Sequence, residues 1–424
     1  MATTKSPTGS TKRQSRNISH PLPRRSTRGP LDAPDDLLVS PEKAPPETPP
    51  PSVAQSKQEV PPPPQPPVQT KPTVDVDLHF LKDPSNYHQL GTEDIPSAFL
   101  DSENQPPQDT PLEDLLQHGH FRRAAGTALI QLSRCPADDA VQIFQLLYVR
   151  LACLVLFSRA DLAAVEAASL TDFLARNAHG AETVTPLIPW ELRILLVRLQ
   201  SIAAADGGRR GIMALYALSA EVRAHVRDAR SDGNDQDLGL WAGRLRDLGL
   251  RVADTLVEMG ELETATRHLD TLRDTNTAEL AYRKALLRLR IGDVAGAQQT
   301  LEKLNDDRKE TLLALMDAAN GDIPSAMDKW RSLAEQHPED ASFASNLAVG
   351  LLYTGKLTEA RQALEDLAMR SPAFPGLLFN IGTIYELCSD RAPSLKTTLA
   401  ERTSSNTATP STGGWERLTF EFKL

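Results

Sequence analysis

The sequence predicts an all-α protein of stacked helical hairpins, an α-solenoid, preceded by a long disordered arm. Three observations predict this fold class. Of the 32 prolines, 23 lie in residues 1–111, and from Pro111 onward alanine, leucine and arginine recur at helical spacing. A glycine followed five residues later by alanine then recurs four times, which indicates an internal repeat. We therefore expect five segments: 1–73, 74–110, 111–250, 251–400 and 401–424.

Residues 1–73 are expected to be a disordered, proline-rich arm. Runs such as PEKAPPETPPPSV and PPPPQPPVQ offer almost nothing to bury, so ordering them would cost conformational entropy without compensation. The simplest interpretation is a spacer that samples polyproline II, and a docking site for a proline-recognising domain is the alternative.

Residues 74–110 form a short linear docking block. The stretch VDVDLHFLKDPSNYHQLGTEDIPSAFL is too apolar for a plain linker and too short for a domain. Phe80 and Tyr87 are its candidate partner contacts, and the partner is either the chain's own helical body or another protein.

Residues 111–250 are expected to be helical and repeat-like, with the repeat register left open. Apolar stripes run through 112–132, 140–157, 161–177, 189–205 and 209–229, separated by Gly, Asp or Pro. The sequence GHFRRA at 119–124 has the Gly-to-Ala spacing without the later apolar residues, so it only suggests a further copy.

Residues 251–400 carry the repeat itself. Each copy has Ala seven residues before the Gly, Ala five residues after it, and apolar residues four and seven positions further on. The glycine permits a tight turn, and the small residues let two helices approach closely. We assign the first copy to Ala253, Gly260, Ala265, Leu269 and Leu272, and the second to Ala285, Gly292, Ala297, Leu301 and Leu304. The third copy comprises Ala314, Gly321, Ala326, Trp330, Leu333 and Pro338, and the fourth comprises Ala348, Gly355, Ala360, Leu364, Leu367 and Pro372.

This order of small residue, Gly, Ala, bulky residue and Pro over about 34 residues resembles the tetratricopeptide repeat. The segment LLFNIGTIYEL, which follows Pro372, is expected to be a fifth first helix. Asn346 and Asn380 lie one repeat apart on first helices, which line the inner groove of such solenoids, so they are candidate partner contacts. A structural Asn is the alternative, because the copy before them has Leu312 at this position and the basic half of a carboxylate clamp is missing.

No motif predicts catalysis, a cofactor or a metal. GGRRG at 207–211 lacks phosphate-loop spacing, and His118 and His120 have no nearby third ligand. A net charge of −10 argues against a dedicated nucleic-acid binder. The three cysteines form no disulfide framework, and no segment predicts a secretory signal or direct membrane insertion.

The C-terminal repeats also resemble the subunit 12 family of the trafficking protein particle (TRAPP) complex. The residues that carry this resemblance are SNLAVGLLYTGKLTEARQALEDL, LLFNIGTIYELCSDRAPSLKTTLAE, and the earlier FLKDPSNYHQL with DIPSAF. It covers about residues 78–424 and departs from the family after Glu401, where RTSSNTATPSTGG resembles an insertion. The last segment, 401–424, is therefore expected to be a partly flexible tail.

The resemblance implies a non-enzymatic scaffold in the cytoplasm, peripheral to ER–Golgi intermediate and Golgi membranes. Its partners would be other TRAPP subunits and, through them, a Rab GTPase and the membrane, in early secretory traffic and autophagy. Two rival hypotheses are a tetratricopeptide co-chaperone or other peptide-binding adaptor, and an enzyme whose site lies within 112–250. The missing clamp cations argue against the first, and the absence of a catalytic motif argues against the second.

Overall fold

The computed structural model describes residues 77–93, 95–177, 182–203, 206, 208–272, 277–302, 304, 308–372, 374–410 and 416. The predicted arm at 1–73 and most of the predicted tail beyond residue 410 lie outside the described residues. The chain divides into two units, Met1–Pro50 and Pro51–Leu424, and everything below concerns the second.

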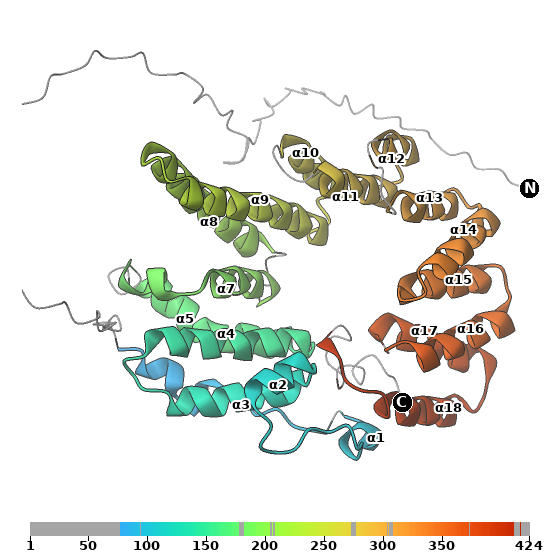
Figure 1. Ribbon diagram of the computed structural model, residues 1–424, viewed down its shortest axis with the longest axis horizontal. Coiled ribbons are helices and arrows are strands. Elements are labelled where there is room, and N and C mark those ends of the chain that lie inside the picture. The colour runs from blue at the N-terminus through green and yellow to red at the C-terminus, as the bar shows by residue number, and fades with distance from the viewer. Residues whose placement is uncertain are drawn as a thin grey trace, which may run out of the picture. The chain divides into compact units, whose positions relative to one another are not determined.

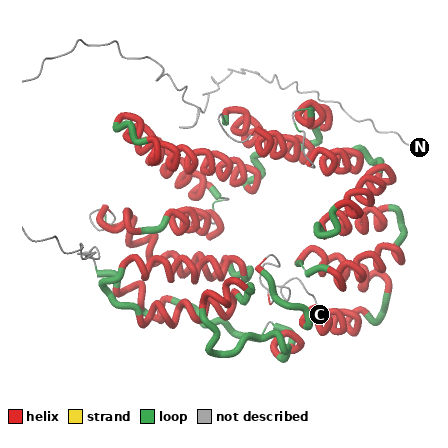
Figure 2. The backbone as a smooth tube through the Cα atoms, viewed as in Figure 1, coloured by secondary structure: helices red, strands yellow, loops and turns green. Residues whose placement is uncertain are grey.

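Every regular element in the described part of the chain is helical, which confirms the all-α prediction (Figures 1 and 2). The N-terminal half contains η1 His79–Lys82, η2 Pro84–Asn86, α1 Ser97–Leu100, α2 Leu112–Gln117, α3 Phe121–Arg134, α4 Ala140–Leu156, α5 Ala160–Arg176, η3 Thr185–Leu187, α7 Trp190–Ala203, α8 Arg209–Ser231 and α9 Asp235–Glu258. The C-terminal half contains α10 Leu262–Thr271, α11 Thr277–Arg290, α12 Val294–Leu301, α13 Arg308–Ala319, α14 Ile323–Gln336, α15 Ala341–Tyr353, α16 Leu357–Arg370, α17 Pro375–Cys388 and α18 Ala392–Ser404.

The four repeat glycines all have left-handed backbone conformations. Gly260, Gly292, Gly321 and Gly355 have φ of 79°, 83°, 84° and 78°. At the last of them, the Gly355 N–H donates to the Leu352 carbonyl at 3.0 Å and the Lys356 N–H donates to the Leu351 carbonyl at 2.9 Å. These two bonds are the Schellman motif, in which a left-handed residue ends a helix and satisfies its last carbonyls.

The same turn occurs three more times upstream, where the repeat register was left open. Gly119, Ser158 and Gly233 have φ of 76°, 61° and 65°. The residue after each turn donates its N–H to the carbonyl four residues before the turn residue: His120 to Leu115 (2.8 Å), Arg159 to Leu154 (2.8 Å) and Asn234 to Ala229 (3.0 Å). Helix pairs α2–α3, α4–α5 and α8–α9 are thus hairpins of the same local design. The break at Gly119 also splits the expected helical segment 112–132 in two.

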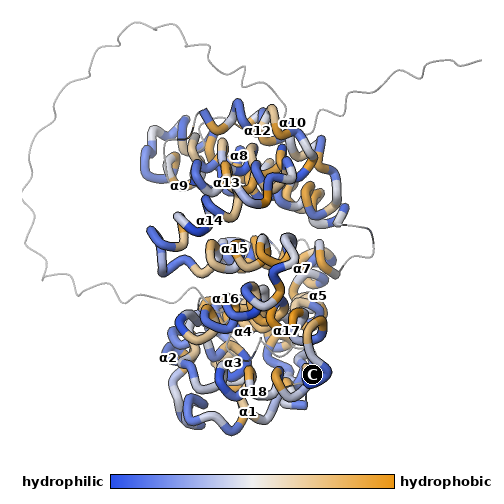
Figure 3. The backbone as a smooth tube through the Cα atoms, turned by 90° about the vertical axis from the view of Figure 1, so that its right-hand side faces the viewer, coloured by the Kyte–Doolittle hydropathy of each residue, from blue (hydrophilic) through white to orange (hydrophobic). Residues whose placement is uncertain are grey.

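Small residues lie where the two helices of a hairpin meet. Ala265, Ala297, Ala326 and Ala360 have no exposed surface, and neither do Ala124 and Ala163, which stand five residues after the upstream turns at Gly119 and Ser158. The alanines seven residues before the repeat glycines are at most 2% exposed: Ala253, Ala285, Ala314 and Ala348. Figure 3 shows hydrophobic and hydrophilic stretches alternating along the helices accordingly.

Two second helices are shorter than the repeat pattern predicts. A regular repeat places the leucine seven residues after the alanine on the same helix, but α10 ends at Thr271 and α12 ends at Leu301. Leu272 and Leu304 therefore follow their helices, although Leu304 is still fully buried. Asp and Asn follow both positions in the sequence, and these residues favour turns over helix interiors.

The first and last helices of the described series share one hydrophobic core. Ile95, Phe99, Leu115 and Phe121 lie in the same buried cluster as residues of α16, α17 and α18, among them Leu364, Leu367, Ile381, Tyr385 and Leu399. Hydrogen bonds reinforce the contact, because Ser102 Oγ donates to the Ser404 carbonyl at 2.6 Å. The Arg122 guanidinium also forms a two-bond ion pair with Glu416, at 2.6 and 2.8 Å.

Trp330 lies inside the third repeat. It is 5% exposed and belongs to a buried cluster with Ala314, Ala326, Leu333 and Phe343. A Cβ at Gly350 of the next first helix would stand 3.6 Å from the Trp330 ring, so the ring packs against bare backbone there. Its buried Nε1 has no hydrogen-bond partner among the described residues, which leaves the indole a packing role.

We predict that Gly355→Ala destabilises the protein by about 1–2 kcal/mol, because an L-residue resists the left-handed conformation. No atom lies within 4 Å of the new Cβ, so the effect is purely conformational. The matched control is Gly239→Ala, an exposed position inside α9 with equally open space. It should be neutral or stabilising by up to about 1 kcal/mol. Urea unfolding of both variants measures the difference, and equal effects would contradict the turn assignment.

We predict that Trp330→Ala destabilises the C-terminal half by about 3–5 kcal/mol, the usual cost of removing a buried aromatic side chain. Trp330→Phe is the control, since it keeps an aromatic ring and removes the unpaired N–H. It should cost less than half as much. Thermal melts of both variants test this, and an unchanged Trp330→Ala melting temperature would refute the inward placement.

Candidate interaction surface

Ion pairs connect the alternate helices α7, α9, α11 and α13. Each pair joins one helix to the next odd-numbered helix along the chain. The pairs are Arg198–Glu258 between α7 and α9 (2.7 Å for Nη2–Oε1), Asp254–Arg283 between α9 and α11 (2.8 Å), and Glu279–Arg308 between α11 and α13 (2.7 Å). Arg283 also donates from Nε to Glu279 within α11 at 2.7 Å. This continuous arrangement is called the ion-pair ladder below.

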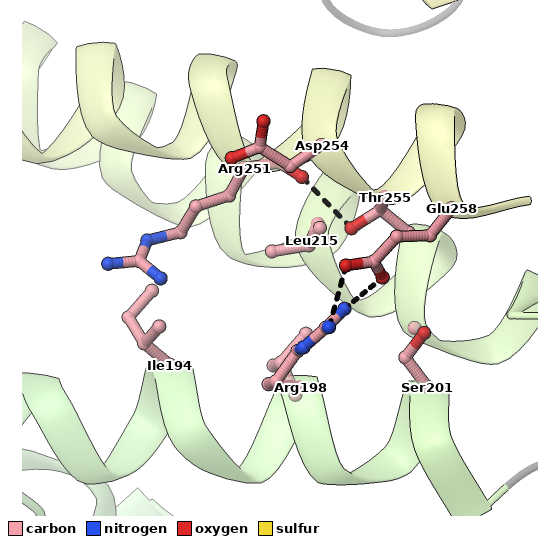
Figure 4. A pocket seen from close by; sticks show the side chains of 10 residues that line it. Ile194, Arg198, Ser201, Leu215, Arg251, Asp254, Thr255 and Glu258 are labelled. Atoms are coloured by element: carbon pink, nitrogen blue, oxygen red, sulfur yellow. Dashed lines mark hydrogen bonds and ion pairs between the residues drawn. The ribbon is translucent and has the colours of Figure 1, made fainter. Parts of the chain in front are cut away.

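Two hollows adjoin the ladder. The first has a volume of about 220 Å³ between α7, α8 and α9, with Ile194 and Leu215 among its apolar lining residues. Figure 4 shows Arg198 and Glu258 pointing toward each other across it. The second, about 350 Å³, lies between α9 and α11 and shares Asp254 with the first.

The electrostatics of the ladder are those of paired charges. The hydrogen bond from Arg283 is the main cause that holds the pKa of Glu279 below its usual value, and Arg308 adds to it. The hydrogen bond with Glu258 raises the pKa of Arg198. Because these side chains are partly exposed, each pair contributes little stability by itself, at most about 1 kcal/mol. The ladder orients neighbouring helices and presents no unpaired nucleophile or base.

The first helices α15 and α17 present a more apolar surface. Tyr353 and Leu387, one repeat apart, are 78% and 67% exposed, and Phe379 is 52% exposed. Asn346 and Asn380, the candidate contacts expected from the sequence, are partly exposed on the same two helices. Neither α15 nor α17 contains Lys or Arg, so this surface offers no cation for a carboxylate. These three exposed apolar residues were not identified from the sequence. They could have been found there, because they are large apolar residues outside the positions that the repeat directs inward.

Within the docking block, residues 77–90 pack on the chain's own helices. Tyr87 is 9% exposed and its hydroxyl donates to the Leu81 carbonyl at 2.5 Å. Burial raises the pKa of this phenol. The Phe80 ring lies 5.2 Å from that of Phe173 in α5, between ring centroids. The sequence left two docking partners open, the chain's own helical body or another protein. In the structure these residues contact the chain's own body, and Tyr87 is an internal contact.

A buried ion pair fixes the end of this block. Arg150 of α4 donates to Glu166 of α5 through Nε (3.0 Å) and Nη2 (2.8 Å), and both side chains are at most 1% exposed. Arg150 Nη2 also donates to the His88 carbonyl at 2.7 Å, while the His88 N–H donates to Glu166 at 2.9 Å. These two hydrogen bonds anchor the backbone of His88 to α4 and α5. Removing either Arg150 or Glu166 would leave the other charge buried without its partner, which is strongly destabilising.

The remaining chemical candidates form no metal-ligand group among the described residues. His118 is exposed, and His120 is buried in a setting whose desolvation lowers the pKa of its imidazole. No group of three metal-ligating side chains occurs within the described ranges. Among the same residues, no helix is both long and apolar enough to span a membrane. Cys135 and Cys153 are buried thiols, and burial raises the pKa of Cys153 to about 12.

Two known proteins that share one name are similar to this chain. Trafficking protein particle complex subunit 12 from Homo sapiens is 25% identical over 224 residues, which is 49% of this chain and 28% of that protein. The Mus musculus protein of the same name is 25% identical over 228 residues, 50% of this chain and 26% of that protein. The chain is built of helical hairpins and is similar to TRAPP subunit 12 over about half of its length. The matches span little more than a quarter of these TRAPP subunits, and no family model matches the chain.

Two solved structures match the chain with low TM-scores. A tetratricopeptide repeat protein from Parabacteroides merdae is 15% identical with a TM-score of 0.38, and the match covers 65% of this chain and 98% of the neighbour. The tetratricopeptide domain of P58(IPK) is 14% identical with a TM-score of 0.21, covering 73% of this chain and 95% of that domain. The expected similarity to TRAPP subunit 12 thus stands on the sequence matches and on the helical repeats described above.

Proposed function

We propose that this chain is a non-catalytic scaffold or adaptor subunit of a TRAPP vesicle-tethering complex. The observation that carries the proposal is the similarity to TRAPP subunit 12 over half of the chain. The described surface supports it, because the charged groups of the ion-pair ladder are mutually paired. The exposed apolar residues of α15 and α17 also lie on helices suited to partner contact.

The proposed mechanism is presentation of surfaces by a stable scaffold. Other TRAPP subunits bind exposed faces of the hairpins, while the buried alanines and leucines keep those faces in register. Exchange of nucleotide on a Rab GTPase would then belong to the neighbouring subunits, in traffic between ER and Golgi and in autophagy. The chain would be peripheral to those membranes and reach them through its partners.

The peptide-clamp alternative finds less support. A clamp for a terminal carboxylate needs cations beside its Asn residues. The two helices that carry Asn346 and Asn380 contain none. On α11 and α13, Arg283 and Arg308 are engaged by Asp254 and Glu279.

Affinity purification of the full chain from cells, with quantitative mass spectrometry, tests the proposal. We predict near-stoichiometric TRAPP subunits in the eluate. A variant with Tyr353→Ser, Phe379→Ser and Leu387→Ser should lose at least one of them, because large exposed apolar residues contribute strongly to interfaces.

The matched control carries Ile130→Ser, Val165→Ser and Met213→Ser, which are also exposed apolar positions but lie on α3, α5 and α8. It should retain the full set of subunits. A wild-type eluate without TRAPP subunits would overturn the proposed function and leave the fold unaffected.

A further inference from the structure

A compact group of aromatic and arginine side chains lies where α7, α8 and α9 meet. It contains two of the four tryptophans of the chain, Trp190 and Trp241, whose ring centroids lie 6.3 Å apart in an edge-on arrangement. His225 of α8 stacks on Trp241 at 4.2 Å with an interplanar angle of 17°. Trp190, Trp241 and His225 are each partly exposed, so the group faces solvent. We call it the Trp–Arg cluster.

Arg244 occupies the centre of the Trp–Arg cluster. Its guanidinium carbon lies 4.7 Å from the ring centroid of Trp190 and 4.6 Å from that of Trp241. Because the two rings stand nearly perpendicular to each other, contact with both restricts the position of the guanidinium and leaves N–H groups at its edge as donors. Among the described residues Arg244 forms no ion pair, and its side chain is partly exposed.

The neighbouring Arg193 shows what such a guanidinium binds in this setting. Its guanidinium also lies over Trp190, at 5.7 Å, and it forms a two-bond ion pair with Glu221 at 2.9 and 2.5 Å. Further along α9, Asp247 pairs with Arg251. Arg244 therefore presents the same stacked cation as Arg193 without a carboxylate of its own.

We propose that the Trp–Arg cluster is a docking site for an acidic segment of a partner protein, with a carboxylate bound by Arg244. A planar guanidinium binds a carboxylate through two parallel hydrogen bonds, and prior stacking reduces the ordering cost. Leu240, one turn before Arg244 and 50% exposed, offers an apolar contact beside it. Trp and Arg are the residue types that dominate binding energy at protein interfaces.

The net charge of −10 does not oppose this recognition at physiological salt. The Debye length is about 8 Å there, so distant acidic residues are screened while a directly bound pair is not. A single-stranded nucleic acid would also stack on Trp, but a nucleic-acid path needs several adjacent cations. In this cluster Arg193 is already neutralised by Glu221, so an acidic protein segment fits the local charge better.

This inference takes one element from the proposed function, namely that the partner is a protein. The test uses the purified full chain in a selection from a phage-displayed library of random short peptides. We expect enriched peptides to carry Asp or Glu beside Leu or an aromatic residue. Their affinity should fall at least about tenfold for both Arg244→Ala and Arg244→Lys, since Lys lacks the planar two-bond geometry.

The matched control is Arg246→Ala, an exposed arginine two residues further along α9 that is outside the cluster. Its affinity for the selected peptides should stay within about twofold of that of the wild type, well below the loss of about tenfold expected for the Arg244 variants. Enrichment of basic or uncharged peptides, or equal losses for Arg244→Ala and Arg246→Ala, would overturn the inference. Both outcomes are independent of whether TRAPP subunits co-purify from cells.

Discussion

The left-handed residue that ends the first helix of a hairpin determines how the two helices of that hairpin meet. It reverses the chain within one residue and brings the alanine five positions later to the contact between helices. With glycine at the turn this geometry has little steric cost, and Ser158 adopts it at a cost of about 1–2 kcal/mol. The burial of Ala163 and the hairpin of α4 with α5 both follow from that turn.

Much of this could be predicted from the sequence, because the turn and the close contact restrict residue type. Gly and Ala recur at fixed spacing for that reason, and the four glycines of the C-terminal half were found this way. Two upstream turns were missed where the restriction is relaxed. Ser replaces Gly at 158, and Leu238 replaces Ala five residues after Gly233. A search that allowed any small or polar residue at the turn would have found Ser158.

Other features depend on contacts between residues far apart in the chain, and no local pattern reports them. The Arg122–Glu416 pair joins positions 294 residues apart, and the stacking of Arg244 on Trp190 joins α9 to α7. For the same reason, the apolar residues of the docking block indicated that it docks but not which surface it contacts. Only the fold shows that Arg150 and Glu166 hold it. Surfaces for partners are the least predictable, because exposed positions such as Tyr353 carry no repeat constraint.

Both halves of the described chain use one kind of hairpin turn, and amide hydrogen exchange measured by NMR can examine each turn separately. The amides to compare belong to the residues that follow the seven turns: His120, Arg159, Asn234, Glu261, Asp293, Asp322 and Lys356. If the turns are equivalent, all seven are hydrogen-bonded and should exchange far more slowly than amides in an unstructured chain. Fast exchange confined to His120, Arg159 and Asn234 would contradict the claim and restrict the repeat to the C-terminal half.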